Sequence, residues 1–200
     1  MTPTETATSR PRVEGDREAE ILVAALAVLG DVGYDRLTMD AVAQRAKASK
    51  ATLYRRWNTK AALVIDALHH GHGSQGEHPE VDTGTLRGDL VAAFCGAGGV
   101  TDKPEVDAFA AILTAITIDP EFAAMFRRDV LAPKLAATRS LFDRAKARGE
   151  VGPDVDIELL APALAGICLN RFFILGEPPT PDVVVRVIDQ IILPAAHAAG

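Results

Sequence analysis

Apolar residues recur at intervals of three and four along most of the chain, and alternation with a period of two is hard to find. Intervals of three and four place apolar side chains on one side of a helix, and the abundant alanine favours helices further. The pattern predicts a first helix from Asp16 to Val32 that closes at Gly33, two short helices within residues 38–60, and a fourth helix from about Thr59 to the glycines near residue 72. The fold class that follows is all-α.

The second half of the chain shows the same helical spacing. Five further helices are predicted, over residues 85–97, 104–118, 119–148, 156–175 and 181–196. Pro133 should bend the third of these, because proline lacks the amide proton of a helical turn. The polar segment from Gly73 to Gly84 separates the two halves. The expected organisation is a disordered arm over 1–15, a helix-turn-helix domain over 16–72, a linker over 73–84, and a helical domain for ligand binding and dimerisation over 85–200.

The last two predicted helices are apolar on more than one side. A helix that is apolar nearly all round must be covered twice, so one side should pack on its own subunit and the other on a second chain. The predicted homodimer interface consists of Leu159, Ala163, Gly166, Phe173, Val184, Val187, Ile188 and Ile191. A tightly packed monomer is the alternative reading of the same pattern.

Charge is distributed unevenly. Between Arg36 and Lys60 there are seven basic residues and one acid, Asp40, although the chain as a whole has a net charge of −6. Residues 73–200 hold 11 Lys plus Arg against 18 Asp plus Glu. Basic charge concentrated on one short segment favours a polyanion as its partner, because each Lys or Arg set against a phosphate releases counterions. The alternative is a solvated basic surface.

The basic segment, TMDAVAQRAKASKATLYRRWNTK, reads as two capped helices joined by a short turn. Thr38 and Ser49 each precede a helical run and are suited to accept hydrogen bonds from its first amides. The segment resembles the DNA-binding domain of the TetR family of bacterial transcriptional regulators. The residues that carry the resemblance are Thr38, Val42, Ala43, Ala46, Ser49, Thr52, Leu53, Tyr54 and Lys60. Lys47 and Ala48 stand where Gly-Val is usual in that family, and Trp57 where Phe is commoner.

The second helix of a helix-turn-helix lies in the major groove, which makes its N-terminal residues candidates for reading bases. Lys60 begins a helix, where the dipole disfavours a cation, so a DNA phosphate would explain its position. The resemblance implies that Tyr54 also contacts a phosphate. The candidate DNA-binding residues are Thr38, Lys47, Ser49, Lys50, Ala51, Thr52, Tyr54, Arg55 and Lys60.

The acidic second half is expected to hold a small-molecule effector and not nucleic acid. The candidate pocket residues are Phe94, Phe109, Ile112, Leu113, Ile116, Phe126, Phe142, Leu164, Cys168 and Phe172. The same residues would equally fill a dry core, and the sequence does not separate these readings.

Several classes of function are disfavoured. No nucleophile elbow or phosphate-binding loop is recognisable, so the sequence does not predict an enzyme or a cofactor. Cys95 and Cys168 read as buried reduced thiols. His69 and His72 have a spacing that permits a metal ion, but a solvated surface turn explains them, and no metal is predicted. No secretory signal is seen, and a cytoplasmic location is expected.

Together these features predict a DNA-binding transcriptional regulator. The expected form is a dimeric repressor that binds double-stranded DNA at a palindromic operator and is released by a small apolar or amphipathic ligand. The alternative is a helical ligand-binding module, or one that binds a protein or RNA, whose basic helix does not read DNA sequence.

Overall fold

A computed structural model describes residues 14–71, 81–96, 99–101 and 103–197, and within these ranges it contains helices and no strands. The all-α prediction is confirmed. The N-terminal helices are α1 (Glu14–Arg36), α2 (Met39–Arg45), α3 (Lys50–Arg56) and α4 (Lys60–Gly71). The remaining elements are α5 (Leu86–Cys95), α6 (Lys103–Ile118), α7 (Pro120–Met125), the π-helix η1 (Phe126–Leu131), α8 (Ala132–Ala147), α9 (Ile157–Leu160), α10 (Ala163–Leu175), α11 (Pro181–Val187), the π-helix η2 (Ile188–Ile192) and α12 (Leu193–His197).

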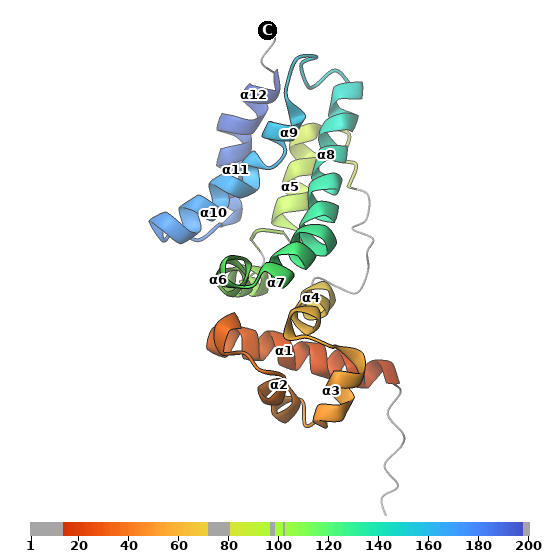
Figure 1. Cartoon of the computed structure of the whole chain (residues 1–200). Helices are drawn as coiled ribbons and strands as arrows, with labels where there is room; N and C mark the ends of the chain where they lie inside the picture. The colour runs from red at the N-terminus through yellow and green to blue at the C-terminus, as the bar shows by residue number, and fades with distance from the viewer. Residues whose placement is uncertain (1–13, 72–80, 97–98, 102, 198–200) are drawn as a thin grey trace, which may run out of the picture.

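Helices α1 to α4 form one end of the molecule, and α12 lies at the other end (Figure 1). The predicted break at Gly33 is present, because this residue has a φ of 78° inside α1 and interrupts the helical backbone. Leu29 from α1, Leu53 from α3 and Leu63 from α4 are at most 1% exposed. With Val42 from α2, which is 0% exposed, they join the four N-terminal helices around one hydrophobic core.

This first core continues past the linker. Ile112 and Ala115 from α6, Phe122 from α7, and Phe126 and Val130 from η1 are buried in the same cluster as the N-terminal helices. Figure 1 shows α6 and α7 lying next to α1 and α4. The linker therefore divides the sequence, but the N-terminal core also includes apolar residues from beyond it.

A second core is built from α5 and from the helices that follow η1. Its buried members include Leu90 from α5, Phe142 from α8, Leu164 from α10 and Ile188 from η2. The continuous helical path through α7, η1 and α8 begins in the first core and ends in the second. A displacement at one end of this path can therefore reach the other through packed side chains.

The bend expected at Pro133 takes the form of a π-helix. Element η1 ends directly before α8, in which Pro133 is the second residue. Element η2 lies in the same way before α12, in which Pro194 is the second residue. A proline offers no amide proton and its ring clashes with the carbonyl four residues earlier, so a wider turn just before it relieves the clash.

The predicted helix over 156–175 is divided. α9 ends at Leu160 and α10 begins after Pro162, because Pro162 cannot donate the amide hydrogen bond that would continue the first helix. The stretch Ile157–Leu175 has a mean hydropathy of 1.6 and is long and apolar enough to cross a membrane by these measures, but 22% of it is buried within its own chain. The subunit itself leaves part of this apolar stretch exposed, including Leu159, Ile174 and Leu175.

The structure corrects part of the predicted dimer interface. Val184, Val187 and Ile188 are at most 6% exposed and belong to the second core of their own chain. They were expected to face a partner, and that expectation is wrong because this side of the last helix packs inward. Leu159 is 74% exposed and Ile191 is 46% exposed. Gly166 is also exposed, whereas Ala163 and Phe173 are half-buried.

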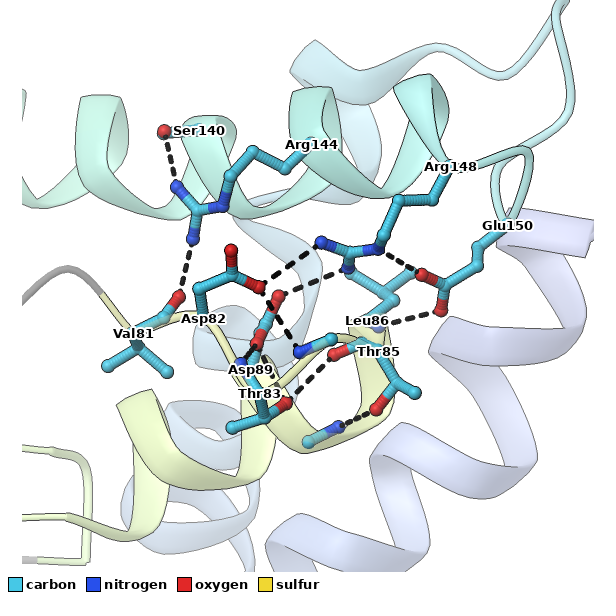
Figure 2. Close-up of polar contacts among 12 residues, drawn as sticks. Val81, Asp82, Thr83, Thr85, Leu86, Asp89, Ser140, Arg144, Arg148 and Glu150 are labelled. Carbon is cyan, nitrogen blue, oxygen red and sulfur yellow. Dashed lines mark hydrogen bonds and ion pairs between the residues drawn. The ribbon is translucent and has the colours of Figure 1, made fainter.

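A buried carboxylate ties the start of α5 to the end of α8 (Figure 2). Asp89 is 0% exposed and its Oδ1 accepts hydrogen bonds from the Thr83 amide at 2.6 Å and the Thr83 hydroxyl at 2.8 Å. Its Oδ2 lies 3.2 Å from Nη2 of Arg148. Arg148 also donates to Glu150, whose other oxygen accepts from the Leu86 amide at 2.7 Å. The chain is thus fixed where it enters the second core.

Candidate nucleic-acid interface

The two short helices α2 and α3 begin with the predicted caps. Thr38 Oγ1 accepts a hydrogen bond from the Ala41 amide at 3.1 Å, and Ser49 Oγ accepts from the Thr52 amide at 3.0 Å. Leu37, directly before the first cap, and Val42, four residues after the cap, are at most 1% exposed, as in a hydrophobic staple. Each cap satisfies amides that a seven-residue helix cannot pair internally, so both helix starts are set by local sequence.

The turn between α2 and α3 forces Lys47 into a left-handed conformation, with a φ of 51°. The Lys47 amide donates to the Gln44 carbonyl at 3.1 Å, and the Ala48 amide donates to the Ala43 carbonyl at 2.8 Å. These two bonds form a Schellman motif, in which the left-handed residue is usually glycine. Helix α8 ends in the same pattern with Gly149 at that position. Lys47 therefore adopts a strained backbone conformation at the helix end.

Replacing Lys47 with Gly is expected to stabilise the protein by about 0.5–1 kcal/mol, because glycine adopts a positive φ without a Cβ clash. Lys47→Ala is the matched control, since it removes the same charge but keeps the Cβ. Thermal unfolding followed by circular dichroism should give a higher midpoint for Lys47→Gly than for Lys47→Ala. Equal midpoints for the two variants would contradict the strain at this turn.

A residue from α1 supports the same turn. Arg17 donates from Nη2 to the Lys47 carbonyl oxygen and from Nη1 to the Glu20 carboxylate. The role of Arg17 at the turn was missed, because a contact thirty residues apart leaves no local signal.

Several of the basic side chains are paired within the domain. Lys50 Nζ lies 2.5 Å from Asp40 Oδ2, Arg56 lies 3.2 Å from Glu18, and Arg45 lies 2.8 Å from Asp31. Exposed pairs of this kind contribute about 0–1 kcal/mol each to stability. Lys47 and Arg55 are exposed, without an ion pair among the described residues. The basic face keeps most of its charge accessible.

Helix α3, whose N-terminal residues are the predicted base contacts, exposes most of these residues to solvent. Ala51 and Arg55 are exposed, Thr52 is half-buried, and Tyr54 is 51% exposed. Such exposure leaves the Tyr54 hydroxyl accessible to a ligand. Trp57, whose spacing places it on the same side as the buried Leu53, is 2% exposed and donates from Nε1 to Asp66 Oδ2 at 2.8 Å. The division of the two aromatics between surface and core agrees with the sequence pattern.

Lys60 has a structural partner that the sequence did not reveal. Its Nζ donates to the Tyr34 carbonyl oxygen at 3.1 Å and lies 4.3 Å from the centroid of the Tyr34 ring. The argument that stability cannot explain a cation at this helix start is therefore wrong, because the hydrogen bond and the cation–π contact hold the ammonium group there. A phosphate contact by Lys60 remains a prediction.

Tyr34 joins the DNA-binding helices to α7. Its side chain is 0% exposed and its hydroxyl donates to Asp119 Oδ2 at 2.6 Å. Asp119 also caps α7 by accepting from the Phe122 amide at 3.0 Å. Burial and the neighbouring carboxylate raise the pKa of Tyr34 far above its usual value, whereas the Tyr34 hydrogen bond, the Phe122 amide and the Lys60 charge lower the pKa of Asp119. Asp119 is thus held as a carboxylate that accepts hydrogen bonds both from Tyr34 and from the first turn of α7.

The segment from Asp119 to Asp129 also meets α4 at both ends. Thr59, directly before α4, donates to Glu121 at 3.3 Å. At the other end, His69 Nε2 lies 3.0 Å from the Asp129 carbonyl oxygen. In a regular helix the amide four residues later would bond this oxygen, but that residue is Pro133, which has no amide proton. His72 lies outside the described residues, and no metal-ligand cluster occurs within the described ones. Helix α4 therefore moves with α7 and η1 unless these contacts break.

The predicted effector pocket does not form as one cavity. Ile112, Ile116 and Phe126 pack in or against the first core, whereas Phe94, Phe142, Leu164 and Cys168 are in the second. Leu113 is 41% exposed, Phe172 is half-buried, and the side chain of Phe109 lies outside the described part. A groove of about 220 Å³ between α8 and α9 is lined by other residues: Leu135, Ala136, Arg139, Ile157, Glu158, Ala161 and Pro162. Most of the candidates therefore fill one of the two cores, in line with the dry-core reading that the sequence left open, because apolar spacing does not tell which core a residue joins.

Comparisons with known proteins agree with this geometry. Residues 21–67 match the bacterial regulatory proteins of the tetR family, and residues 80–191 match the tetracyclin repressor-like C-terminal domain. The chain is 35% identical over 182 residues to an HTH-type transcriptional regulator of Mycobacterium tuberculosis. The aligned residues cover 90% of this chain and 87% of that protein. It is also 35% identical over 180 residues to the DNA-binding transcriptional repressor TetR of Mycobacteroides abscessus, with 88% and 92% covered.

Among solved structures, GusR of Salmonella enterica has a TM-score of 0.74 at 19% identity and covers 96% of this chain and 100% of its own. At that identity the likeness concerns the fold. It extends over both cores and is not limited to the helix-turn-helix.

Proposed function

The chain belongs to the TetR family of bacterial regulatory proteins and is a DNA-binding transcriptional regulator. We propose that it acts as a repressor that binds a palindromic operator as a dimer. A small apolar or amphipathic ligand then releases the repressor from the operator. Repression is proposed because a similar protein of Mycobacteroides abscessus carries the name of a repressor. We place the protein in the cytoplasm, because a bacterial DNA-binding regulator acts where the DNA is. The family consists of regulators and not of enzymes.

The observation that carries the proposal is the exposed face of α3. A capped helix presents Lys50, Ala51, Tyr54 and Arg55 outward, next to a turn and a supporting helix, as a major-groove reader requires. The alternative of a module for protein or RNA is less favoured, because A-form RNA has a major groove too narrow for such a helix. Base contacts would specify the sequence, while Tyr54 and Lys60 would position the domain on phosphates.

Dimerisation is proposed from the uncovered apolar surface of the last helices. Leu159, Ile174, Leu175 and Ile191 are each at least 46% exposed within the single chain. Exposed apolar side chains that recur on consecutive helices support an interaction site, and symmetric dimers are the commonest assembly. Two reading helices related by a two-fold axis would contact half-sites about one turn of DNA apart.

Release by a ligand is proposed to act through the segment from Asp119 to Asp129. This segment holds Tyr34 and both ends of α4, and it continues into α8 and the second core. A ligand that favours another packing of the second core would thereby change the spacing of the two reading helices. By linkage, that ligand lowers DNA affinity as much as DNA lowers the affinity for the ligand.

The test is selection of bound duplexes from a random pool, followed by titration against salt. We expect a palindrome bound roughly a thousandfold more tightly than random duplex, with affinity that falls steeply between 50 and 200 mM salt. Tyr54→Ala should weaken binding to the palindrome and to random duplex by the same factor, because it removes a phosphate contact. If the protein enriches no sequence over random duplex, the proposed function is wrong.

A further inference from the structure

Asp40 is an acid on a surface that otherwise favours DNA. It is the single Asp or Glu between Arg36 and Lys60, and it occupies the second position of α2. Its side chain is 56% exposed and faces the start of α3. A carboxylate at this place repels approaching phosphates, so its presence lowers the general affinity for DNA.

The Asp40 carboxylate holds the first residue of the reading helix. Its Oδ2 lies 2.5 Å from Nζ of Lys50, which is itself 65% exposed. On the other side of the turn, Arg17 bonds the Lys47 carbonyl and fixes the backbone that leads into α3. The Lys50 ammonium group is therefore directed by α2, although its backbone belongs to α3.

Stability alone does not explain this arrangement. An acid in the first turn of a helix is favoured by the helix dipole, and Asp40 would have this benefit without Lys50. An exposed Lys–Asp pair adds little to stability. A lysine stem loses rotamer entropy when its end is fixed, so a contact that already restrains Lys50 lowers that cost on binding.

We propose that Asp40 is a positioning residue that aims Lys50 at a guanine and makes it a base reader instead of a general phosphate contact. This inference rests on the proposed function of α3 as the reading helix. The ammonium group has three donors, so one can bond Asp40 while the others reach the O6 and N7 acceptors of guanine in the major groove. Because Asp40 offsets the charge of Lys50, the pair adds specificity with little non-specific attraction.

The experiment uses the full-length protein and the palindrome that the wild type selects. The guanine in question is identified first, as the G·C pair whose replacement weakens the wild type but not Lys50→Met. Binding of Asp40→Asn is then measured on the selected palindrome, on the palindrome with that pair replaced in both half-sites, and on random duplex. We expect Asp40→Asn to lose at least fivefold of the discrimination at that pair and to bind random duplex about two- to tenfold more tightly, with a steeper salt dependence.

Asp31→Asn is the matched control. Asp31 forms a similarly exposed pair with Arg45 at 2.8 Å, on the α1–α2 side of the domain. Its substitution makes the same change in net charge. It should therefore raise the affinity for random duplex slightly and leave discrimination at the G·C pair unchanged. Thermal midpoints of both variants establish that they fold.

The proposal is overturned if Asp40→Asn keeps the discrimination of the wild type, or if no G·C pair depends on Lys50. A loss of random binding together with specific binding also overturns it, since that result indicates a structural role. Failure of the wild type to select any palindrome is a different result, because it contradicts the proposed function itself.

Discussion

Ile191→Glu is expected to leave the protein monomeric and to reduce its affinity for the palindromic operator by roughly a hundredfold or more. Ile191 is 46% exposed in η2, which lies between α11 and α12 near the end of the chain. In a two-fold dimer the substitution places two glutamates in one apolar interface, and burying an unpaired carboxylate is strongly unfavourable. A monomer contacts one half-site at a time and loses the gain of linked binding, about 10²–10⁴.

Light scattering coupled to size exclusion gives the oligomeric state, and gel-shift titration gives the affinity. Leu113→Glu is the matched control, because Leu113 is 41% exposed but lies on α6, outside the last helices. That variant should remain dimeric and bind the operator. A dimeric Ile191→Glu protein would show that the interface lies elsewhere, and a monomeric Leu113→Glu protein would place α6 in it.

Asp89→Ala is expected to destabilise the fold by about 2–4 kcal/mol. The substitution leaves the Thr83 amide without its acceptor and removes the buried partner of Arg148. Asp82→Ala is the matched control: Asp82 also lies near Arg148, at 3.5 Å, but its side chain is 56% exposed. Its loss should cost no more than about 0.5 kcal/mol. Denaturant unfolding at one protein concentration separates the two variants. Equal losses of stability would contradict the structural role of the buried Asp89 carboxylate.

The Asp89 carboxylate also makes the stability of the fold depend on pH. Burial alone would raise the pKa of Asp89, but the hydrogen bonds from Thr83 and the charge of Arg148 outweigh it and lower the pKa below 3.8. A carboxyl whose pKa is lower in the folded state contributes stability that is fully present above the unfolded pKa and is lost as pH falls through the folded value. Between pH 5 and 3 the wild type should therefore lose more stability than Asp89→Asn, which has no carboxyl to protonate.

Much of the DNA-binding end was predictable from local sequence. The caps at Thr38 and Ser49, the break at Gly33 and the burial of Trp57 each depend on a few neighbouring residues, and all are present. Lys47 was recognised as the unusual residue at the turn, and its φ of 51° gives the reason. These features are local because helix ends are satisfied by side chains within about four residues.

The contacts that connect the two ends were not predictable in the same way. Asp119 before Pro120 is a recognisable helix start, but its bond with Tyr34, 85 residues away, has no signature in the pattern. Lys60 was assigned to phosphate alone because its partner Tyr34 is remote in sequence. Asp40 and Lys50 are ten residues apart on different helices, and only the angle between those helices brings their charges together.

The sequence by itself determined the helical class, the capped helix-turn-helix and the basic face, since periodicity, capping and charge are written into short stretches. The tertiary structure decided which apolar face turns inward: Val184, Val187 and Ile188 fill the chain's own core, while Leu159 and Ile191 remain outside. It also decided that the predicted pocket residues divide between two cores. The physical reason is that hydrophobic burial is non-directional, so an apolar side chain specifies that it is covered but not by which neighbour.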